Sequence, residues 1–154
     1  MKPRLIIAES DESLAEDYGD FFWKRGFGVE VAGDGLRCLE LLHQFPPHAL
    51  ILDHDLPWGG AEGVVAAMRD EFHLATIPVL MIADEAGPQS ASLNTTPVVA
   101  WFRKPIRLDS LWSALSVEIP ELITEGFLNQ AESLLPATRR DIDDQMSTRG
   151  LSAR

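Results

Sequence analysis

The chain has 154 residues, of which 45% are hydrophobic, and it carries a formal net charge of −11. This length allows one domain with a core of ordinary size. The acidic balance argues against non-specific binding of nucleic acid, because phosphate contacts need Lys and Arg, and it suits basic or metal-ion partners. The single cysteine, Cys38, excludes an internal disulfide framework and is expected to pack as a small core residue in a reducing compartment.

Membrane insertion and secretion are also disfavoured. The apolar run near the start of the chain, residues 5–8, is too short for the core of a signal peptide. No stretch approaches the roughly 20 apolar residues of a membrane span. We therefore expect a cytoplasmic protein that binds neither membranes nor nucleic acid.

Five short apolar runs predict strands, at residues 4–8, 29–32, 49–52, 78–83 and 97–102. The third run is apolar throughout, which suggests that its strand is buried on both faces. Helical patterns lie between the runs. An alternation of this kind indicates an α/β fold, in which helices cover both faces of a parallel sheet.

The first helical pattern places Leu14, Tyr18 and Phe22 on one stripe, and Ser10 or Asp11 could cap its start. For Ser10 a capping role is favoured over metal binding. Further helices are expected around residues 36–42, 64–72 and 108–115.

The connection between the last two strands, residues 84–96, differs from the others. It contains Gly87, Pro88 and several Ser, Thr and Asn residues, which favour turns over helices. The fourth helix of the pattern should therefore be short, late or absent.

A further helix is expected after the closing strand and helix. Ile123, Phe127, Ala131 and Leu134 recur at helical spacing, which predicts an amphipathic helix over residues 119–136. Residues 137–154 are polar and are expected to be disordered.

Polar residues follow four of the predicted strands. They are Glu9-Ser10, Asp53, Ala83-Asp84 and Lys104-Pro105. Ligands of open parallel sheets gather at the carboxyl ends of the strands. These residues would therefore place carboxylates and a lysine around one pocket.

The segments "GDGLRCLELL", "ALILDHDLP", "IPVLMIADEA" and "WFRKPIRLDSL" contain or adjoin these residues. Over about residues 3–118 the chain resembles the receiver domain of two-component response regulators. The most specific pair is Asp53, with Pro57 four residues on, and Lys104-Pro105 about 50 residues later. The resemblance implies a receiver domain over residues 1–118 with a flavodoxin-like (βα)5 fold, a doubly wound sheet of strand order 2-1-3-4-5.

The resemblance also implies roles for single residues. Asp53 matches the phosphoacceptor, Lys104 matches the lysine that contacts the phosphoryl group, and Pro105 follows a cis peptide bond. Magnesium would be held by Glu9, Asp53 and the backbone carbonyl of Asp55, whose side chain is expected to be solvated. Glu9 could instead be an ordinary charge at the start of a helix.

Three positions depart from the family pattern. Ser10 stands where the family has a second acidic metal ligand, and a hydroxyl is a poor replacement for a carboxylate toward Mg²⁺. Ala83 stands at the first switch position, where the family has Thr or Ser. Trp101 stands at the second, where Tyr or Phe is usual.

Three functions remain open. The first is a phosphoacceptor that receives phosphate from a histidine kinase or phosphotransfer protein and acts through a downstream protein or a homodimer. It would catalyse at most its own phosphorylation and dephosphorylation. The second is a phosphorylation-independent pseudo-receiver that binds proteins. The third, a haloacid-dehalogenase-like phosphatase suggested by Asp53-x-Asp55, is disfavoured because the later motifs of that family are missing.

Overall fold

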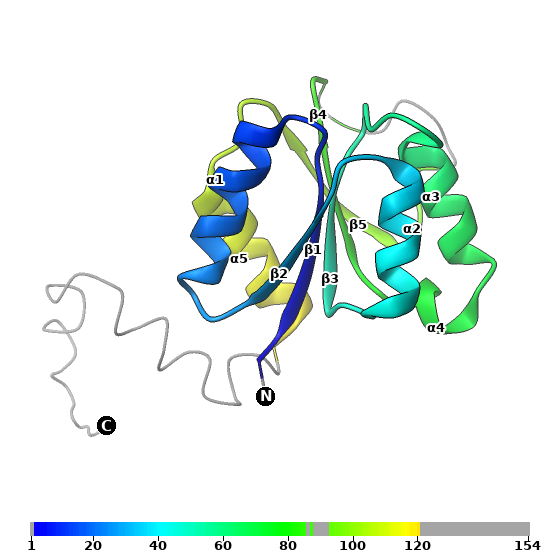
Figure 1. The fold of residues 1–154 in the computed structure, drawn as a ribbon, viewed down its shortest axis with the longest axis horizontal. Helices are drawn as coiled ribbons and strands as arrows, with labels where there is room; N and C mark the ends of the chain where they lie inside the picture. Colours follow the sequence, from blue (N-terminus) through cyan, green and yellow to red (C-terminus); the bar gives the residue numbers. More distant parts are fainter. Residues whose placement is uncertain (1, 86, 88–92, 121–154) are drawn as a thin grey trace, which may run out of the picture.

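The fold is a five-stranded parallel sheet between two layers of helices, in a computed structural model that describes residues 2–85, 87 and 93–120 (Figure 1). The strands are β1 (Arg4–Ala8), β2 (Gly28–Ala32), β3 (Ala49–Asp53), β4 (Val79–Ala83) and β5 (Val98–Arg103). The helices are α1 (Glu12–Trp23), α2 (Gly35–Gln44), α3 (Gly60–Arg69), α4 (Phe72–Ala75) and α5 (Leu108–Glu118). The strand order is β2-β1-β3-β4-β5, which confirms the predicted order.

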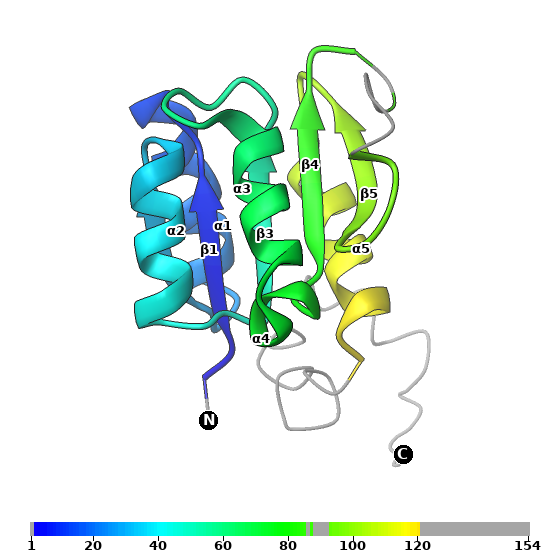
Figure 2. The same cartoon turned by 90° about the vertical axis from the view of Figure 1, so that its right-hand side faces the viewer.

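The two helical layers bury opposite faces of the sheet. Helices α1 and α5 cover one face, and α2, α3 and α4 cover the other (Figures 1 and 2). Alternate residues of each central strand enter the two cores: Leu5 and Ile7 of β1 pack with α1 and α5, whereas Ile6 packs on the opposite side. All five residues of β3 are buried, as its apolar run predicts.

Of the two residues that could cap α1, Asp11 does so and Ser10 does not. Asp11 is the N-cap, because its backbone is extended and its carboxylate accepts a hydrogen bond from the Leu14 amide at 3.1 Å. Ser10 is exposed and does not cap the helix. A capping role for Ser10 is therefore wrong.

The third helix begins and ends earlier than predicted, at Gly60 and Arg69. Helix α3 ends at Arg69, and Glu71 adopts an extended conformation before the short helix α4 begins at Phe72. Phe72 does not lie on the buried stripe of α3, and its side chain is 88% exposed. Because the chain turns at Asp70 and Glu71, Phe72 does not continue the helical spacing of α3. That spacing was the reason to expect its burial.

The connection from β4 to β5 lacks an α-helix in the part that the structure describes, residues 84, 85, 87 and 93–97. Leu93 is fully buried in the core, and the Arg69 guanidinium donates to the carbonyl oxygens of Thr95 and Thr96. The connection is thus held against α3. The predicted amphipathic helix lies outside the described residues from residue 121 onward. None of the described helices is long and apolar enough to cross a membrane.

His43 of α2 contacts Glu71, the N-cap of α4, and the strength of this contact depends on pH. The Nε2 atom of His43 lies 2.8 Å from a carboxylate oxygen of Glu71, and Nδ1 lies 2.8 Å from the Leu39 carbonyl. The hydrogen bond to Glu71 and then that to Leu39 raise the pKa of His43 above its ordinary 6.5. The contribution of protonated His43 to folding stability is therefore fully present below the pKa that His43 has in the unfolded chain. It is lost as the pH rises through the higher pKa of His43 in the folded chain.

Glu71→Gln should lower the pKa of His43, measured by NMR titration of the imidazole. Glu40→Gln is the control, because it removes a carboxylate of the same helix α2 that pairs with Arg37 instead. An unchanged His43 pKa in Glu71→Gln would contradict the pairing.

Candidate functional site

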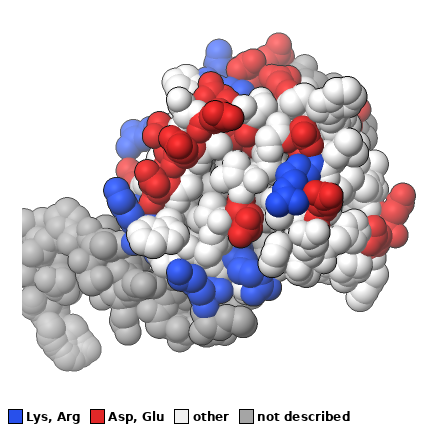
Figure 3. All heavy atoms as spheres, in the orientation of Figure 1, with Lys and Arg blue, Asp and Glu red and all other residues white. Residues whose placement is uncertain are grey.

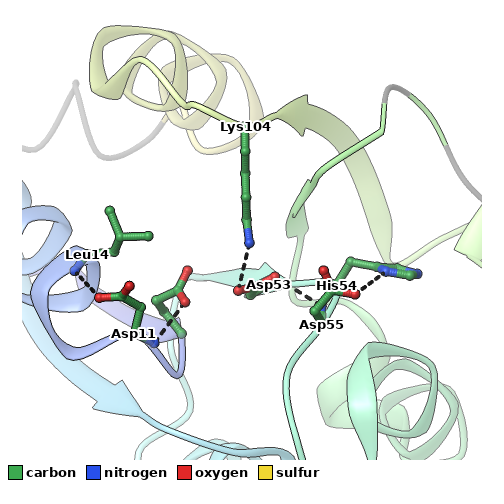
Figure 4. A network of polar contacts seen from close by, with 7 residues as sticks. Asp11, Leu14, Asp53, His54, Asp55 and Lys104 are labelled. Carbon is green, nitrogen blue, oxygen red and sulfur yellow. Dashed lines mark hydrogen bonds and ion pairs between the residues drawn. The ribbon is translucent and has the colours of Figure 1, made fainter.

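Asp53 lies at the end of β3, and its carboxylate is almost fully buried, with 3% of the residue exposed. One oxygen accepts a hydrogen bond from the Asp55 amide at 3.0 Å, and the other lies 3.2 Å from the Lys104 ammonium (Figure 4). A buried carboxylate needs such partners, because its desolvation is otherwise costly. The fold thus joins two residues that are 51 positions apart in sequence.

Glu9 follows β1 and is the second buried carboxylate of the site. One of its oxygens, Oε2, accepts from the Asp11 amide at 3.0 Å, whereas Oε1 is buried and has no hydrogen-bond partner. Burial is the main cause of a Glu9 pKa raised to about 7; the neighbouring Asp53 also raises the pKa, and the Asp11 amide and Lys104 lower it. At neutral pH Glu9 is therefore divided between its charged and neutral forms.

Lys104 follows β5, and its backbone amide donates to the Ala83 carbonyl at 2.8 Å. The peptide bond from Lys104 to Pro105 is cis. Burial acts to lower the pKa of Lys104, but the carboxylates of Asp53, Glu9 and Asp84 outweigh it, and the pKa is raised. Lys104 is therefore a fixed cation beside Asp53.

A small cleft beside these residues is lined by His54, Asp55, Ala83, Asp84 and Glu85, with a volume of about 160 Å³. Ala83 is buried at the end of β4 and brings no hydroxyl group to the cleft. The three carboxylates give it negative potential next to a site that already holds Glu9 and Asp53.

Trp101 lies on β5 and packs against the core. Its indole is half-buried against the core, its N–H donates to the Leu93 carbonyl at 3.4 Å, and its ring lies 6.1 Å from that of His54. Trp101 thus connects β5 with the loop after β3.

The described residues offer few ligands to a divalent cation. They contain no cluster of three or more His, Cys, Asp or Glu side chains able to hold a metal, and Ser10 is exposed. Mg²⁺ is nevertheless often bound through one or two carboxylates with several waters. The unpartnered Oε1 of Glu9, close to Asp53, fits a hydrated ion of this kind and not an all-protein cage.

Sequence reasoning missed the contact that positions the loop after β3. The Gly35 amide at the start of α2 donates to the Pro57 carbonyl at 2.8 Å, and a Cβ atom at Gly35 would overlap the backbone oxygen of Trp58. Trp58 itself has φ of 55° and a side chain that is 73% exposed. The sequence shows only a turn, "GDG", at this position, and nothing in it links Gly35 to Trp58.

The sequence pattern predicts only that Tyr18 lies on the buried stripe of the first helix. Burial raises the pKa of its hydroxyl to about 12, and the charges of Glu9 and Asp53 contribute. Helix α1 therefore brings a buried, neutral phenol close to the two carboxylates.

No family model matches the chain. Its sequence is 34% identical to the transcriptional activator protein PfeR of Pseudomonas aeruginosa over 109 residues, which are 71% of this chain and 35% of PfeR. The chain thus spans between 16% and 37% of the length of the curated relatives it matches first.

Solved structures share the fold at low sequence identity. The chemotaxis response regulator CheY4 of Vibrio cholerae superposes with a TM-score of 0.71 at 20% identity, covering 77% of this chain and 99% of that one. The receiver domain of the sensor histidine kinase PA1611 of P. aeruginosa, described with a magnesium ion coordinated in its active site cleft, gives a TM-score of 0.67 at 14% identity. It covers 78% of this chain and 99% of that one.

Gly35→Ala should disturb the loop after β3, because the new Cβ atom meets backbone and not a movable side chain. Overpacking of this kind costs about 1–3 kcal/mol of folding free energy. Gly33→Ala is the matched control, since nothing lies within 4 Å of its Cβ position. Equal stability of the two variants in denaturant-induced unfolding would show that the contact with Trp58 is unimportant.

Proposed function

The chain has the fold of the receiver domains of two-component response regulators, and we propose that it accepts a phosphoryl group on Asp53. One observation carries the proposal: a buried Asp53 is held between the Lys104 ammonium at 3.2 Å and the Asp55 amide at 3.0 Å. The neighbouring carboxylate of Glu9 is also buried, and one of its oxygens has no hydrogen-bond partner among the described residues. A purely structural role leaves such a buried, unsatisfied oxygen unexplained.

These contacts support a direct transfer of the phosphoryl group. A carboxylate oxygen of Asp53 attacks the phosphorus of a phosphorylated histidine, forming a P–O bond while the P–N bond breaks. The electron pair returns to the imidazole nitrogen, and the product is an acyl phosphate on Asp53. Lys104 offsets the charge that accumulates on the phosphoryl oxygens, and the Asp55 amide fixes the orientation of the attacking carboxylate.

A magnesium ion, when bound, would supply the additional positive charge that phosphoryl transfer requires. Glu9, Asp53 and the backbone carbonyl of Asp55 would hold it. Because only two carboxylates contribute and Ser10 is neutral, binding should be weak.

The source of the phosphoryl group would be a histidine kinase or a phosphotransfer protein. The phosphorylated chain would act through contact with a downstream protein or as a homodimer. The formal charge of −11 supports protein contacts over nucleic-acid binding. No catalysis is proposed beyond phosphorylation and dephosphorylation of Asp53 itself.

Incubation with a small acyl phosphate and Mg²⁺ should add one phosphoryl group, measured by intact mass. Asp53→Asn should abolish the addition, because an amide is not a nucleophile of this kind. The matched control is Asp55→Asn, which removes a neighbouring carboxylate whose side chain is 59% exposed. Phosphate addition that survives Asp53→Asn, or none in the unaltered chain, would refute the proposal.

A second candidate is a pseudo-receiver that binds partners without phosphorylation. It is favoured by Ala83, which offers no hydroxyl to a phosphoryl group, and by Asp55, Asp84 and Glu85, which line the adjacent cleft and would repel it. An absence of phosphate addition, together with a partner interaction that Asp53→Ala leaves intact, would favour this candidate.

The metal site can be tested apart from phosphorylation. Ser10→Asp should raise the affinity for Mg²⁺ by about tenfold, which corresponds to about 1.4 kcal/mol, because it adds a charged oxygen ligand. Glu9→Gln should lower the affinity. Titration of tryptophan fluorescence with Mg²⁺ can measure both. Identical affinities in all three chains would contradict a magnesium site at Glu9.

A further inference from the structure

A second hollow opens beside β2, one of the two edge strands of the sheet, with a volume of about 290 Å³. Its walls include Leu5, Val29, Trp23 and Phe45, with Arg4 and Glu30 contributing charge. Arg4 and Gly28 begin β1 and β2, so the hollow lies toward the amino edge of the sheet, whereas Asp53 lies at the carboxyl edge.

Two aromatic side chains are presented to solvent on the walls of this hollow. Trp23, the last residue of α1, is 62% exposed, and Phe45, the C-cap of α2, is 46% exposed. Single exposed apolar residues are common, but two large aromatics around one apolar hollow indicate a binding surface.

The rim of the hollow carries two basic side chains, Arg4 in its wall and Lys2 beside Trp23, together with the acidic Glu30. The Lys2 ammonium lies 5.9 Å from the Trp23 ring, and the Arg4 guanidinium donates to the Pro46 carbonyl at 2.6 and 2.9 Å. Within residues 2–85, 87 and 93–120, the ion pairs involve neither Lys2 nor Arg4. Figure 3 shows basic side chains along the lower edge of this face and acidic ones over its upper left part.

The chain leaves the described domain at the same edge. Each helix of the α/β fold returns antiparallel to the strands, so α5 ends near the amino edge of the sheet, as α1 and α2 do (Figures 1 and 2). Ile119 is still buried, and Pro120 is exposed. The next residues, 121–135, read "ELITEGFLNQAESLL".

This segment complements the hollow in both polarity and charge. Ile123, Phe127, Ala131 and Leu134 share one stripe at helical spacing. The segment also carries Glu121, Glu125 and Glu132, and it contains no Lys or Arg. An acidic segment would be repelled over most of the acidic domain and attracted at the rim formed by Lys2 and Arg4.

We propose that residues 121–135 dock within the same molecule into the hollow beside β2. The apolar stripe covers Trp23 and Phe45, and the glutamates face Lys2 and Arg4. This docking does not depend on phosphorylation, because the hollow lies at the amino ends of the strands and Asp53 lies at their carboxyl ends.

The test uses the full chain and its backbone and indole NMR resonances. Phe127→Asp should shift the resonances of the Trp23 indole, Val29 and Phe45. Asn129→Asp is the matched control, because it adds the same charge on the opposite side of the helical stripe, and it should leave these resonances in place. Shifts confined to other surfaces, such as that around Val99 and Val117, would overturn the proposal, and so would no shifts in Phe127→Asp.

The charges provide a second, reciprocal test. Lys2→Glu should increase the amide hydrogen-exchange rates of residues 121–135, whereas Arg37→Glu, a charge reversal remote from the hollow, should not. Both measurements are repeated on dilution. Shifts or exchange rates that depend on protein concentration would identify a second copy of the chain as the occupant and overturn intramolecular docking.

Discussion

The burial of the Asp53 carboxylate is the constraint on which the rest of the site depends. A carboxylate in this position is stable only if a cation and hydrogen-bond donors reach it, and Lys104 and the Asp55 amide do so. Removal of one partner from a buried ion pair costs about 3–5 kcal/mol. Lys104 reaches Asp53 because β4 pairs with both β3 and β5, which brings the carboxyl ends of all three strands to one edge of the sheet.

The same edge holds more negative charge than its lysine can offset. Burial, followed by the nearby Asp53, raises the pKa of Glu9 to about 7, and its Oε1 atom has no partner in the described residues. The site is therefore electrostatically suited to gaining positive charge, from a cation or a proton. Ser10 and Ala83 reduce the help that an incoming phosphoryl group would find, so the balance between the two candidate functions depends on these two positions.

The two ends of the sheet have different chemical characters. The carboxyl edge gathers Glu9, Asp53 and Lys104, whereas the amino edge presents Trp23 and Phe45 beside Lys2 and Arg4. This separation follows from the parallel topology, because every strand begins at one edge and ends at the other. The proposed chemistry at Asp53 and the proposed docking beside β2 would therefore use opposite ends of the sheet.

The strands could be predicted from the sequence because apolar periodicity is a local signal. The strand order and the association of Asp53 with Lys104, 51 positions apart, were implied only by the family resemblance. The sequence did not distinguish Ser10 from Asp11 as the cap, since both residue types cap helices equally well and only the backbone geometry selects one. It likewise placed Phe72 on a helix that ends at Arg69. The contact of Gly35 with Trp58, the unpartnered oxygen of Glu9 and the hollow beside β2 were decided only by tertiary structure, because each depends on distances between segments that are far apart in the chain.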